Sequence, residues 1–267
     1  MISVPQEVSN VHKPLAGKRA LLTGSTSGIG LETAARLAES GVSRLVINGR
    51  DRERGERARQ TLAERAPGVD AAFVASDVST PEGARALIEG ALAHLGGGID
   101  ILVTCAGGDH APTLFHETSL DEIEAVVRHW LLGTLHCCRL ALPHVADGGA
   151  IVTVASDAAK VPTPGESVIG AAMAGIAMFS RTLAMEAKRR RIRVNVVTPS
   201  LVRNTLTHDR ITAGGFSARL FEKVAAAAHL GVPEPADVAA LITFLAMPHA
   251  AKLTGQAISV NGGISAG

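Results

Sequence analysis

A glycine-rich turn near the beginning of the chain is the first stretch that could bind a charged ligand. The segment LLTGSTSGIG places Gly24, Gly28 and Gly30 directly after a predicted strand and at the start of a predicted helix. Because these residues have no side chains, backbone N–H groups can approach a pyrophosphate at the positive end of the helix dipole. The strand before the glycines and the helix after them favour a dinucleotide site over an ordinary tight turn.

A single arginine after the next predicted strand bears on the type of dinucleotide. The segment VINGR ends without the acidic residue that would bind a ribose 2′-hydroxyl, and Arg50 stands there instead. A guanidinium can bind a 2′-phosphate, so this position favours NADP(H) over NAD(H). The alternative is a solvated arginine that opens an arginine-rich helix.

Strand and helix patterns alternate along the chain and would position these groups. Short apolar, β-branched runs predict strands, and stretches with helical periodicity lie between them. The predicted strands are 19–24, 44–50, 71–77, 99–108, 150–156, 192–200 and 256–263, and the predicted helices are 31–40, 52–65, 81–95, 121–145 and 170–189. Strand alternating with helix is typical of an α/β fold with a doubly wound, parallel sheet of seven strands.

The same pattern predicts one domain with two less regular parts. We expect a flexible N-terminal arm over residues 1–14 and a single Rossmann-type domain over residues 15–267. The segment 201–233 lies between the sixth and seventh predicted strands. Loops beyond the carboxyl ends of parallel strands form the ligand crevice, so this segment is predicted to be a substrate lid.

The composition narrows the class of partner. Lys plus Arg number 26 against 25 for Asp plus Glu, so the net charge of +1 gives no support for nucleic acid or an anionic membrane surface. A small molecule is the expected ligand. Three cysteines indicate a reducing compartment, the cytoplasm by default, and neither a signal peptide nor a membrane span is predicted. No metal site is expected, since the consecutive His136, Cys137 and Cys138 would point in different directions on a helix.

Several motifs in order resemble the short-chain dehydrogenase/reductase (SDR) family. They are TGxxxGIG at 23–30, DV at 77–78, CAGG at 105–108, VNVVTPS at 194–200, and EPADVAALITFLA and LTGQAISVNGG near the end. The resemblance covers about 15–263. It implies a seven-stranded Rossmann-type domain that binds a nicotinamide cofactor and assembles as a homodimer or homotetramer.

The resemblance also implies which residues contact the cofactor. They are Gly24, Ser25, Ser27, Gly28, Ile29, Gly30, Arg50, Asp77, Val78, Ala106, Gly107, Pro199, Ser200 and Val202.

The catalytic set implied by the resemblance is incomplete. The family serine is Ser156, at the end of the fifth predicted strand, whereas the family tyrosine and lysine positions hold Ile169 and Met173. The family asparagine position holds Trp130, and the chain contains no tyrosine at all. Isoleucine cannot donate a proton, and a thioether is at best a weak acceptor for ribose hydroxyls. Considered alone, Ile169, Met173 and Ile176 form an apolar stripe that is typical of a helix core.

Other polar residues flank the expected pocket and could supply a proton. They are Asp109, His110, His129, Asp157, Lys160, Glu166 and Ser167, and a surface or packing role is the alternative for each.

Three hypotheses about function follow. The first is a divergent NADP(H)-dependent oxidoreductase, for which reduction of a conjugated C=C would suit Ser156 and backbone donors. The second is a catalytically silent subunit or ligand-binding protein, in a hetero-oligomer with an active relative. The third is a non-redox enzyme on the same scaffold, which the retained glycine motif disfavours.

Overall fold

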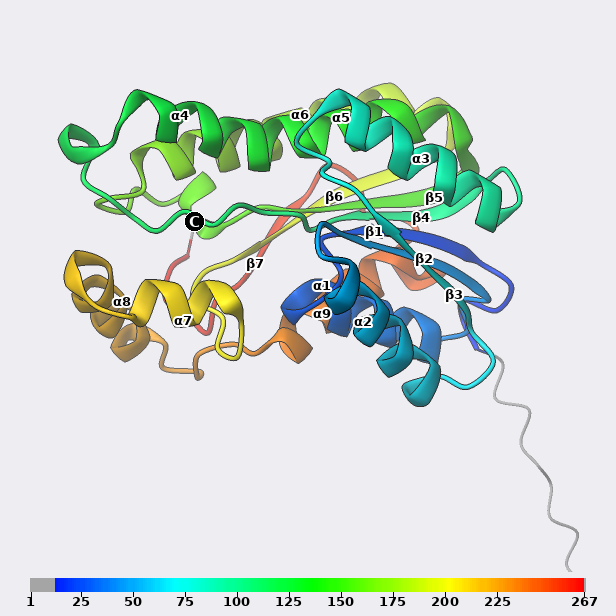
Figure 1. The fold of residues 1–267 in the computed structure, drawn as a ribbon, viewed down its shortest axis with the longest axis horizontal. Helices are drawn as coiled ribbons and strands as arrows, with labels where there is room; N and C mark the ends of the chain where they lie inside the picture. The colour runs from blue at the N-terminus through cyan, green and yellow to red at the C-terminus, as the bar shows by residue number, and fades with distance from the viewer. Residues whose placement is uncertain (1–12, 267) are drawn as a thin grey trace, which may run out of the picture.

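The computed structural model describes residues 13–266, and they form one three-layer α/β domain (Figure 1). The strands are β1 (Arg19–Thr23), β2 (Arg44–Gly49), β3 (Asp70–Ala75), β4 (Ile99–Thr104), β5 (Val145–Val154), β6 (Arg193–Pro199) and β7 (Ala257–Val260). They make one parallel sheet in the order β3-β2-β1-β4-β5-β6-β7. The predicted fold class and the seven strands are confirmed.

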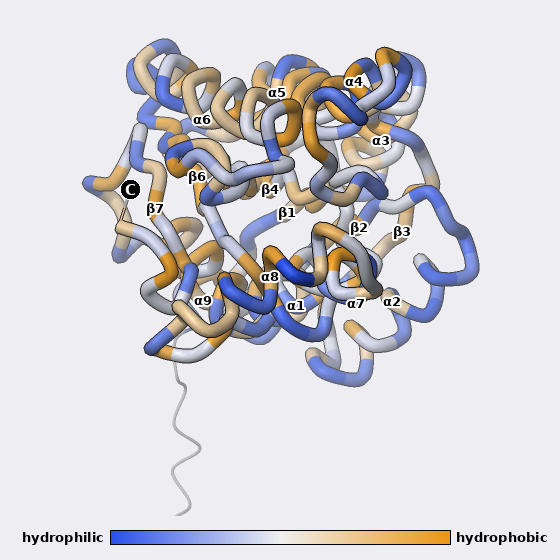
Figure 2. The backbone as a smooth tube through the Cα atoms, turned by 90° about the vertical axis from the view of Figure 1, so that its left-hand side faces the viewer, coloured by the Kyte–Doolittle hydropathy of each residue, from blue (hydrophilic) through white to orange (hydrophobic). Residues whose placement is uncertain are grey.

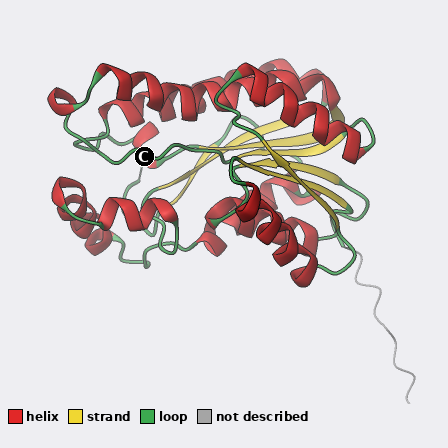
Figure 3. Cartoon of the chain, in the orientation of Figure 1, coloured by secondary structure: helices red, strands yellow, loops and turns green. Residues whose placement is uncertain are grey.

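Helices cover both faces of this sheet (Figures 1 and 3). On one face lie α1 (Gly28–Glu39), α2 (Arg52–Arg65) and α9 (Pro235–Ala246), and on the other lie α3 (Pro81–Leu95), α5 (Gly133–Ala141) and α6 (Ser167–Ala187). Each layer has its own apolar cluster, one around Leu22, Leu37 and Ile242 and the other around Leu21, Leu87 and Leu183. The central strands are buried from both sides, as their continuous apolar runs require.

Capping residues explain why two helices have the predicted bounds. The carboxylate of Asp51 accepts a hydrogen bond from the Arg54 amide at the start of α2. The Thr80 hydroxyl accepts from the Gly83 amide before Pro81 begins α3, and Gly96, with a φ of 70°, ends it. Such residues satisfy the free backbone groups at helix ends and so fix the boundary.

The single helix predicted over 121–145 is wrong. The chain instead forms α4 (Leu120–Val126), a π-helical turn over Val127–Leu132, α5, and a 3-10 turn over Leu142–His144, after which β5 begins. Pro143 lacks an amide hydrogen, which explains the end of α5. No residue in the sequence indicates the π-helical turn in the way that Pro143 indicates the end of α5.

The predicted lid is more regular than its sequence indicated. Residues 201–233 contain α7 (Leu206–Thr212) and α8 (Gly215–Ala227), which lie beside the carboxyl ends of the strands (Figure 1). Buried Ile211 and Phe221 join the two helices in a separate small core with Leu201. Whether the segment opens and closes over a substrate stays a prediction.

Among residues 13–266, one helix is long and apolar enough to cross a membrane by length and composition alone, namely α6 with its continuation to Arg190. It packs against β6 and contributes Ile176, Leu183 and Ala184 to the buried core. Figure 2 shows α5 and α6 as largely hydrophobic and α2 as largely hydrophilic. A core helix explains this apolar character. Of the arm expected over residues 1–14, residues 1–12 lie outside the described residues.

Candidate active site

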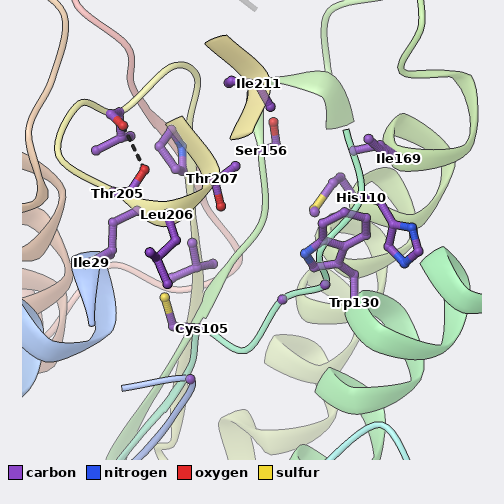
Figure 4. Close-up of a pocket in the computed structure, with 18 of the residues that line it drawn as sticks. Ile29, Cys105, His110, Trp130, Ser156, Ile169, Thr205, Leu206, Thr207 and Ile211 are labelled. Carbon is purple, nitrogen blue, oxygen red and sulfur yellow. Dashed lines mark hydrogen bonds between the residues drawn. The ribbon is translucent and has the colours of Figure 1, made fainter. Parts of the chain in front are cut away.

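A cavity of about 850 Å³ opens at the carboxyl ends of the strands. Its walls come from the turn after β1, from the ends of β2 to β6, from the start of α6, from α7 and α8, and from the last residues of the chain. Figure 4 shows Ile29 and Leu206 on one side and Trp130 with His110 on the other. Ligands of open parallel sheets bind at this edge, so the cavity is the candidate active site.

The glycine turn fits a pyrophosphate closely. Gly24 and Gly28 have φ angles of 59° and 52°, a region that favours glycine. A Cβ on Gly30 would lie 2.2 Å from the Gly24 carbonyl oxygen, so the third residue of α1 must be a glycine. Ser27, the N-cap of α1, makes no capping hydrogen bond with its side chain. The first backbone amides of α1, a helix of twelve residues, therefore receive no hydrogen-bond acceptor from the Ser27 side chain. They can instead bind an anion in the cavity.

Two arginines share one carboxylate at the rim of the cavity. Arg50 Nη2 lies 3.2 Å from Asp109 Oδ2, and Arg210 Nη2 of α7 lies 3.0 Å from Asp109 Oδ1. All three side chains are partly solvated, with Arg50 51% exposed. Arg50 is thus at the cavity, as predicted, but its partner is a residue of the loop after β4.

Asp77 lies near this rim and is ionised. Burial raises the pKa of its carboxyl, but hydrogen bonds from Ser79 and the charge of Arg50 outweigh that effect, and the net shift is downward. The Ser79 amide donates to Asp77 Oδ1 at 3.0 Å.

Almost all of the predicted cofactor residues line the cavity. These are Gly24, Ser27, Gly28, Ile29, Gly30, Arg50, Asp77, Val78, Ala106, Gly107, Pro199, Ser200 and Val202. Ser25 does not. Its buried hydroxyl donates to the Leu22 carbonyl and accepts from the Asn48 amide, so it ties β1 to β2.

Ser156 lines the cavity just after β5. Its hydroxyl accepts a hydrogen bond of 3.2 Å from the Ala158 amide. That bond uses a lone pair and leaves the hydroxyl hydrogen free to donate to a ligand oxygen.

The wall next to Ser156 is apolar. Ile169 and Met173 line the cavity and are only 9% and 6% exposed, and with Ile176 they belong to one buried cluster. The predicted apolar stripe is confirmed. Trp130, on the π-helical turn, packs against Gly107, where an added Cβ would come within 2.6 Å of the indole Nε1. The wide turn and the missing side chain together admit the indole.

Asp157, one of the flanking candidates, has a structural role. Its two carboxylate oxygens accept hydrogen bonds from Ser259, Asn261 and Ser265, and Lys160 Nζ lies 3.9 Å away. Lys160 and Ser167 do not line the cavity. The aspartate thereby fixes the C-terminal segment against the cavity wall, to which Ser265 belongs.

Two histidines meet beside Trp130. His110 Nε2 and His129 Nδ1 are 3.3 Å apart, and the two rings are stacked with centroids separated by 5.5 Å. Burial lowers the pKa of His129, while the charge of Asp77 opposes this effect. Both rings line the cavity, so two of the flanking candidates lie together in it.

Known proteins match this chain over nearly its full length. The family model described as Enoyl-(Acyl carrier protein) reductase matches residues 24–265. The 3beta-hydroxysteroid dehydrogenase 1 of Eggerthella lenta is 33% identical over 96% of both chains. A 2,3-dihydroxy-2,3-dihydro-p-cumate dehydrogenase of Pseudomonas putida is 34% identical over 94% of this chain and 95% of its own.

A solved dehydrogenase/reductase of Sinorhizobium meliloti 1021 superposes with a TM-score of 0.84 at 31% identity, covering 94% of this chain and 96% of that one. The chain belongs to the short-chain dehydrogenase/reductase family. The SDR family consists of oxidoreductases that bind NAD(P), which agrees with the glycine turn and the position of the cavity.

Several cavity residues of this SDR were missed from the sequence. The lid helices contribute Thr205, Thr207, Ile211, Leu220, Phe221 and Val224, and the C-terminal segment contributes Ile264 and Ser265. The amphipathic spacing of Leu220, Phe221 and Val224 could have identified the first group, whereas nothing local marks the second.

No group of three or more His, Cys, Asp or Glu side chains that could hold a metal ion occurs within residues 13–266. Burial raises the pKa of Cys105, which lines the cavity, to about 12. Its thiol therefore stays protonated and is not an activated nucleophile.

Proposed function

We propose that this SDR is an NADP(H)-dependent oxidoreductase that acts on a small, largely apolar carbonyl compound. The observation that carries the proposal is the single cavity that joins the glycine turn and Arg50 at one end to Ser156 at the other. A ligand of dinucleotide length, bound along the turn, and a substrate beside Ser156 would share this space.

The choice of NADP(H) rests on Arg50. This side chain lines the cavity after β2, and no acidic residue ends that strand. The adjoining Arg54 also lines the cavity and adds positive charge. The 2′-phosphate of NADP(H) would form ion pairs with these two arginines, whereas the 2′-hydroxyl of NAD(H) carries no charge to pair with them.

Catalysis in this proposal proceeds without the standard tyrosine and lysine of the family, whose positions we assign to Ile169 and Met173. The nicotinamide supplies a hydride to carbon when it is bound. Ser156 then donates a hydrogen bond to the substrate oxygen, where negative charge develops. Trp130, which we assign to the family asparagine position, narrows the cavity next to Gly107.

The apolar wall supports an apolar substrate. Ile169, Met173, Ile211 and Phe221 enclose the space near Ser156. One relative is named for a steroid alcohol. Reduction of a carbonyl and of a conjugated C=C both place charge on oxygen, so the site suits either reaction.

We propose that the protein acts as a cytoplasmic homodimer or homotetramer, as SDR proteins are typically oligomers. Met178 and Met185 of α6 are 60% and 59% exposed, which supports a subunit contact on that helix.

Calorimetric titration with NADPH and NADP+, followed by NADPH oxidation with a panel of cyclic ketones and enones, tests this function. We expect NADPH to bind more tightly than NADH, and the nicotinamide absorbance to fall only when substrate is present. Absence of nucleotide binding would contradict the proposed oxidoreductase function.

A silent subunit is the second candidate, favoured by the apolar residues at the proton-donor and ribose-anchor positions. Nucleotide binding without turnover, together with co-purification of an active SDR relative from the native source, would support it.

A further inference from the structure

Glu166 introduces a carboxyl group into the apolar part of the cavity. It directly precedes α6 and lines the cavity three residues before Ile169. The Gly170 amide donates to the Glu166 carbonyl oxygen at 2.6 Å, so Glu166 already belongs to the first helical turn. Both Glu166 and Ile169 line the cavity, so the carboxyl lies on the same cavity lining as the apolar residues of α6.

The other carboxyl groups of the cavity are already engaged. Each accepts a hydrogen bond from an amide or a hydroxyl, or pairs with a cation. Asp51 accepts from the Arg54 amide, Asp77 from the Ser79 amide, Asp109 pairs with Arg50 and Arg210, and Asp157 accepts from Ser259, Asn261 and Ser265.

Glu166 has weaker partners than these four, because a hydrogen bond with the Thr163 side chain is its one polar contact among the described residues. Within residues 13–266, no lysine, arginine or histidine lies within ion-pair distance of its carboxyl. The first amides of α6 could stabilise a carboxylate, but the Glu166 side chain makes no capping hydrogen bond to them. Burial raises the pKa of Glu166, and the negative charge of Asp157 raises it further. A hydrogen bond with Thr163 lowers the pKa, but the net shift is upward. Burial and a neighbouring carboxylate both favour the neutral form of this carboxyl over its ionised form.

We propose that Glu166 is the proton donor of this active site and recognises the oxygen atom of an uncharged carbonyl substrate through its carboxyl O–H. The proposal rests on the proposed oxidoreductase function, and it deepens that function by assigning the donor that Ile169 cannot provide.

In this reaction NADPH is the reductant and Glu166 is the acid. Hydride from NADPH forms the new C–H bond, and the π pair of the carbonyl moves to oxygen. That oxygen takes the proton of Glu166, which becomes a carboxylate, while NADPH becomes NADP+. A proton taken up from bulk solvent then restores the protonated form of Glu166. For a conjugated enone, hydride adds to the β carbon and Glu166 protonates the enolate oxygen, after which the enol tautomerises to the ketone.

The same arrangement disfavours anionic substrates. A substrate carboxylate near Ser156 would approach the negative charge of Asp157 and the apolar wall formed by Ile169 and Met173. Arg210, a lid residue that lines the cavity, is paired with Asp109. The compartment therefore favours a neutral ring ketone over an acid of the same size.

Other titratable groups face the same cavity and could contribute a pH dependence. They are Arg50, Asp51 and Arg54 after β2, Asp77 after β3, Cys105, Asp109 and His110 after β4, His129 on the π-helical turn, Asp157 after β5, and His208 and Arg210 on α7. Any effect of these groups persists when Glu166 is replaced, so the comparison of variants separates them.

The first test is the protonation state of Glu166 itself. The infrared carbonyl band of protonated carboxyl groups is measured at neutral pH in wild type, Glu166→Gln and Glu186→Gln. Glu186 lies on the exposed face of the same helix and is the matched control. We expect part of the band to be lost in Glu166→Gln only. An unchanged band in that variant overturns the proposal.

The second test is binding of 2-adamantanone and of 1-adamantanecarboxylate, which are similar in size and differ in charge. Calorimetry with the NADP+-saturated protein should detect the ketone and not the acid. Ketone binding should weaken as the pH rises through the raised pKa of Glu166 in wild type and in Glu186→Gln, but not in Glu166→Gln, whose amide still donates. Equal binding of the acid, or no ketone binding up to its solubility limit, overturns the proposal.

The third test is turnover. With a reducible cyclic ketone, Glu166→Gln should lower kcat by about 100-fold or more, the usual contribution of general acid catalysis, with little change in KM or in NADPH affinity. An unchanged kcat overturns the assignment. If wild type binds NADPH but reduces nothing, the proposed function fails, while the first two tests still decide whether Glu166 is a neutral donor.

Discussion

The guanidinium of Arg50 and the carboxylate of Asp109 form an ion pair of 3.2 Å across the rim of the cavity, 59 residues apart in the chain. Asp109 also pairs with Arg210 of α7 at 3.0 Å. One carboxylate therefore joins the end of β2 to the lid. Any anion that binds Arg50 must approach the negative charge of Asp109.

Replacing Asp109 should consequently improve binding of the phosphorylated cofactor. Asp109→Asn removes the competing charge, and exposed ion pairs are worth up to about 1 kcal/mol, so NADP+ affinity should rise by roughly two- to fivefold. NAD+ affinity should stay constant, and Arg50→Gln should reduce NADP+ affinity alone. Calorimetry measures all three. Weaker NADP+ binding by Asp109→Asn would contradict this view.

Trp130 should report cofactor binding directly. It is the single tryptophan of the chain and lines the cavity. Reduced nicotinamide absorbs where indole emits, so NADPH should quench the emission in proportion to occupancy. Trp130→Phe is the control, because it removes the signal. Calorimetric binding of NADPH without quenching would place the nicotinamide away from Trp130.

Gly30→Ala should disrupt the turn that holds the pyrophosphate. The new Cβ would lie 2.2 Å from the Gly24 oxygen and 2.8 Å from Ser25 Cα, both backbone atoms. We expect a loss of about 1–3 kcal/mol in unfolding free energy, typical of overpacking, together with weaker nucleotide binding. Chemical denaturation measures the first effect.

Gly133→Ala is the matched control, because its Cβ would meet Val78 only at 3.6 Å, which is ordinary contact. Alanine favours a helix over glycine by about 0.5–1 kcal/mol, so this variant should be slightly more stable. Similar losses from both substitutions would show that the clash at Gly30 is not the cause.

The pKa of Glu166 predicts how its replacement changes stability with pH. Its folded-state pKa is raised above the unfolded value. Folding therefore favours the protonated form, and the wild type loses stability as the pH rises from the unfolded pKa through the folded one. Glu166→Gln should be more stable than wild type at and above neutral pH, and this difference should vanish near pH 4. Denaturation at several pH values measures it, and a pH-independent difference would be contrary to expectation.

Ile169→Tyr with Met173→Lys should create carbonyl reductase activity if the rest of the cavity resembles that of other SDR enzymes. The lysine would enter a buried apolar cluster, so the variant should be less stable. Initial rates of NADPH oxidation with cyclic ketones measure the gain, and the two single variants serve as controls. A double variant that binds NADPH but stays inert would identify Trp130 as the next obstacle.

Much of the fold could be predicted because its signals are local. The seven strands are short apolar runs, and α2 and α3 are bounded by Asp51, Thr80 and Gly96, whose capping chemistry is independent of tertiary structure. The helix predicted over 121–145 failed where spacing in the sequence does not distinguish i→i+4 from i→i+5 hydrogen bonds. The lid was underestimated because its two helices gain their small core only by packing against each other.

The site was predicted in part for the same reason. Motif spacing located the glycine turn, Arg50 and Ser156, and these line one cavity. Ser25 was assigned to the cofactor, although its hydroxyl joins two strands. The pairing of Asp109 with Arg50 and Arg210, and the anchoring of the C-terminal segment by Asp157, depend on contacts between residues roughly 60 to 110 positions apart. Sequence patterns over a few residues carry no record of such contacts.

The π-helical turn over Val127–Leu132 holds Trp130 in the cavity wall. The shape of the cavity therefore depends on how many residues this turn contains. A π turn accommodates one residue more than the α-helix around it. Deleting a single residue there should restore a regular helix between α4 and α5, turn the Trp130 position by about 100°, one α-helical step, and remove the indole from Gly107. Variation in chain length at this point, rather than substitution, would then be the shortest route to a differently shaped substrate compartment.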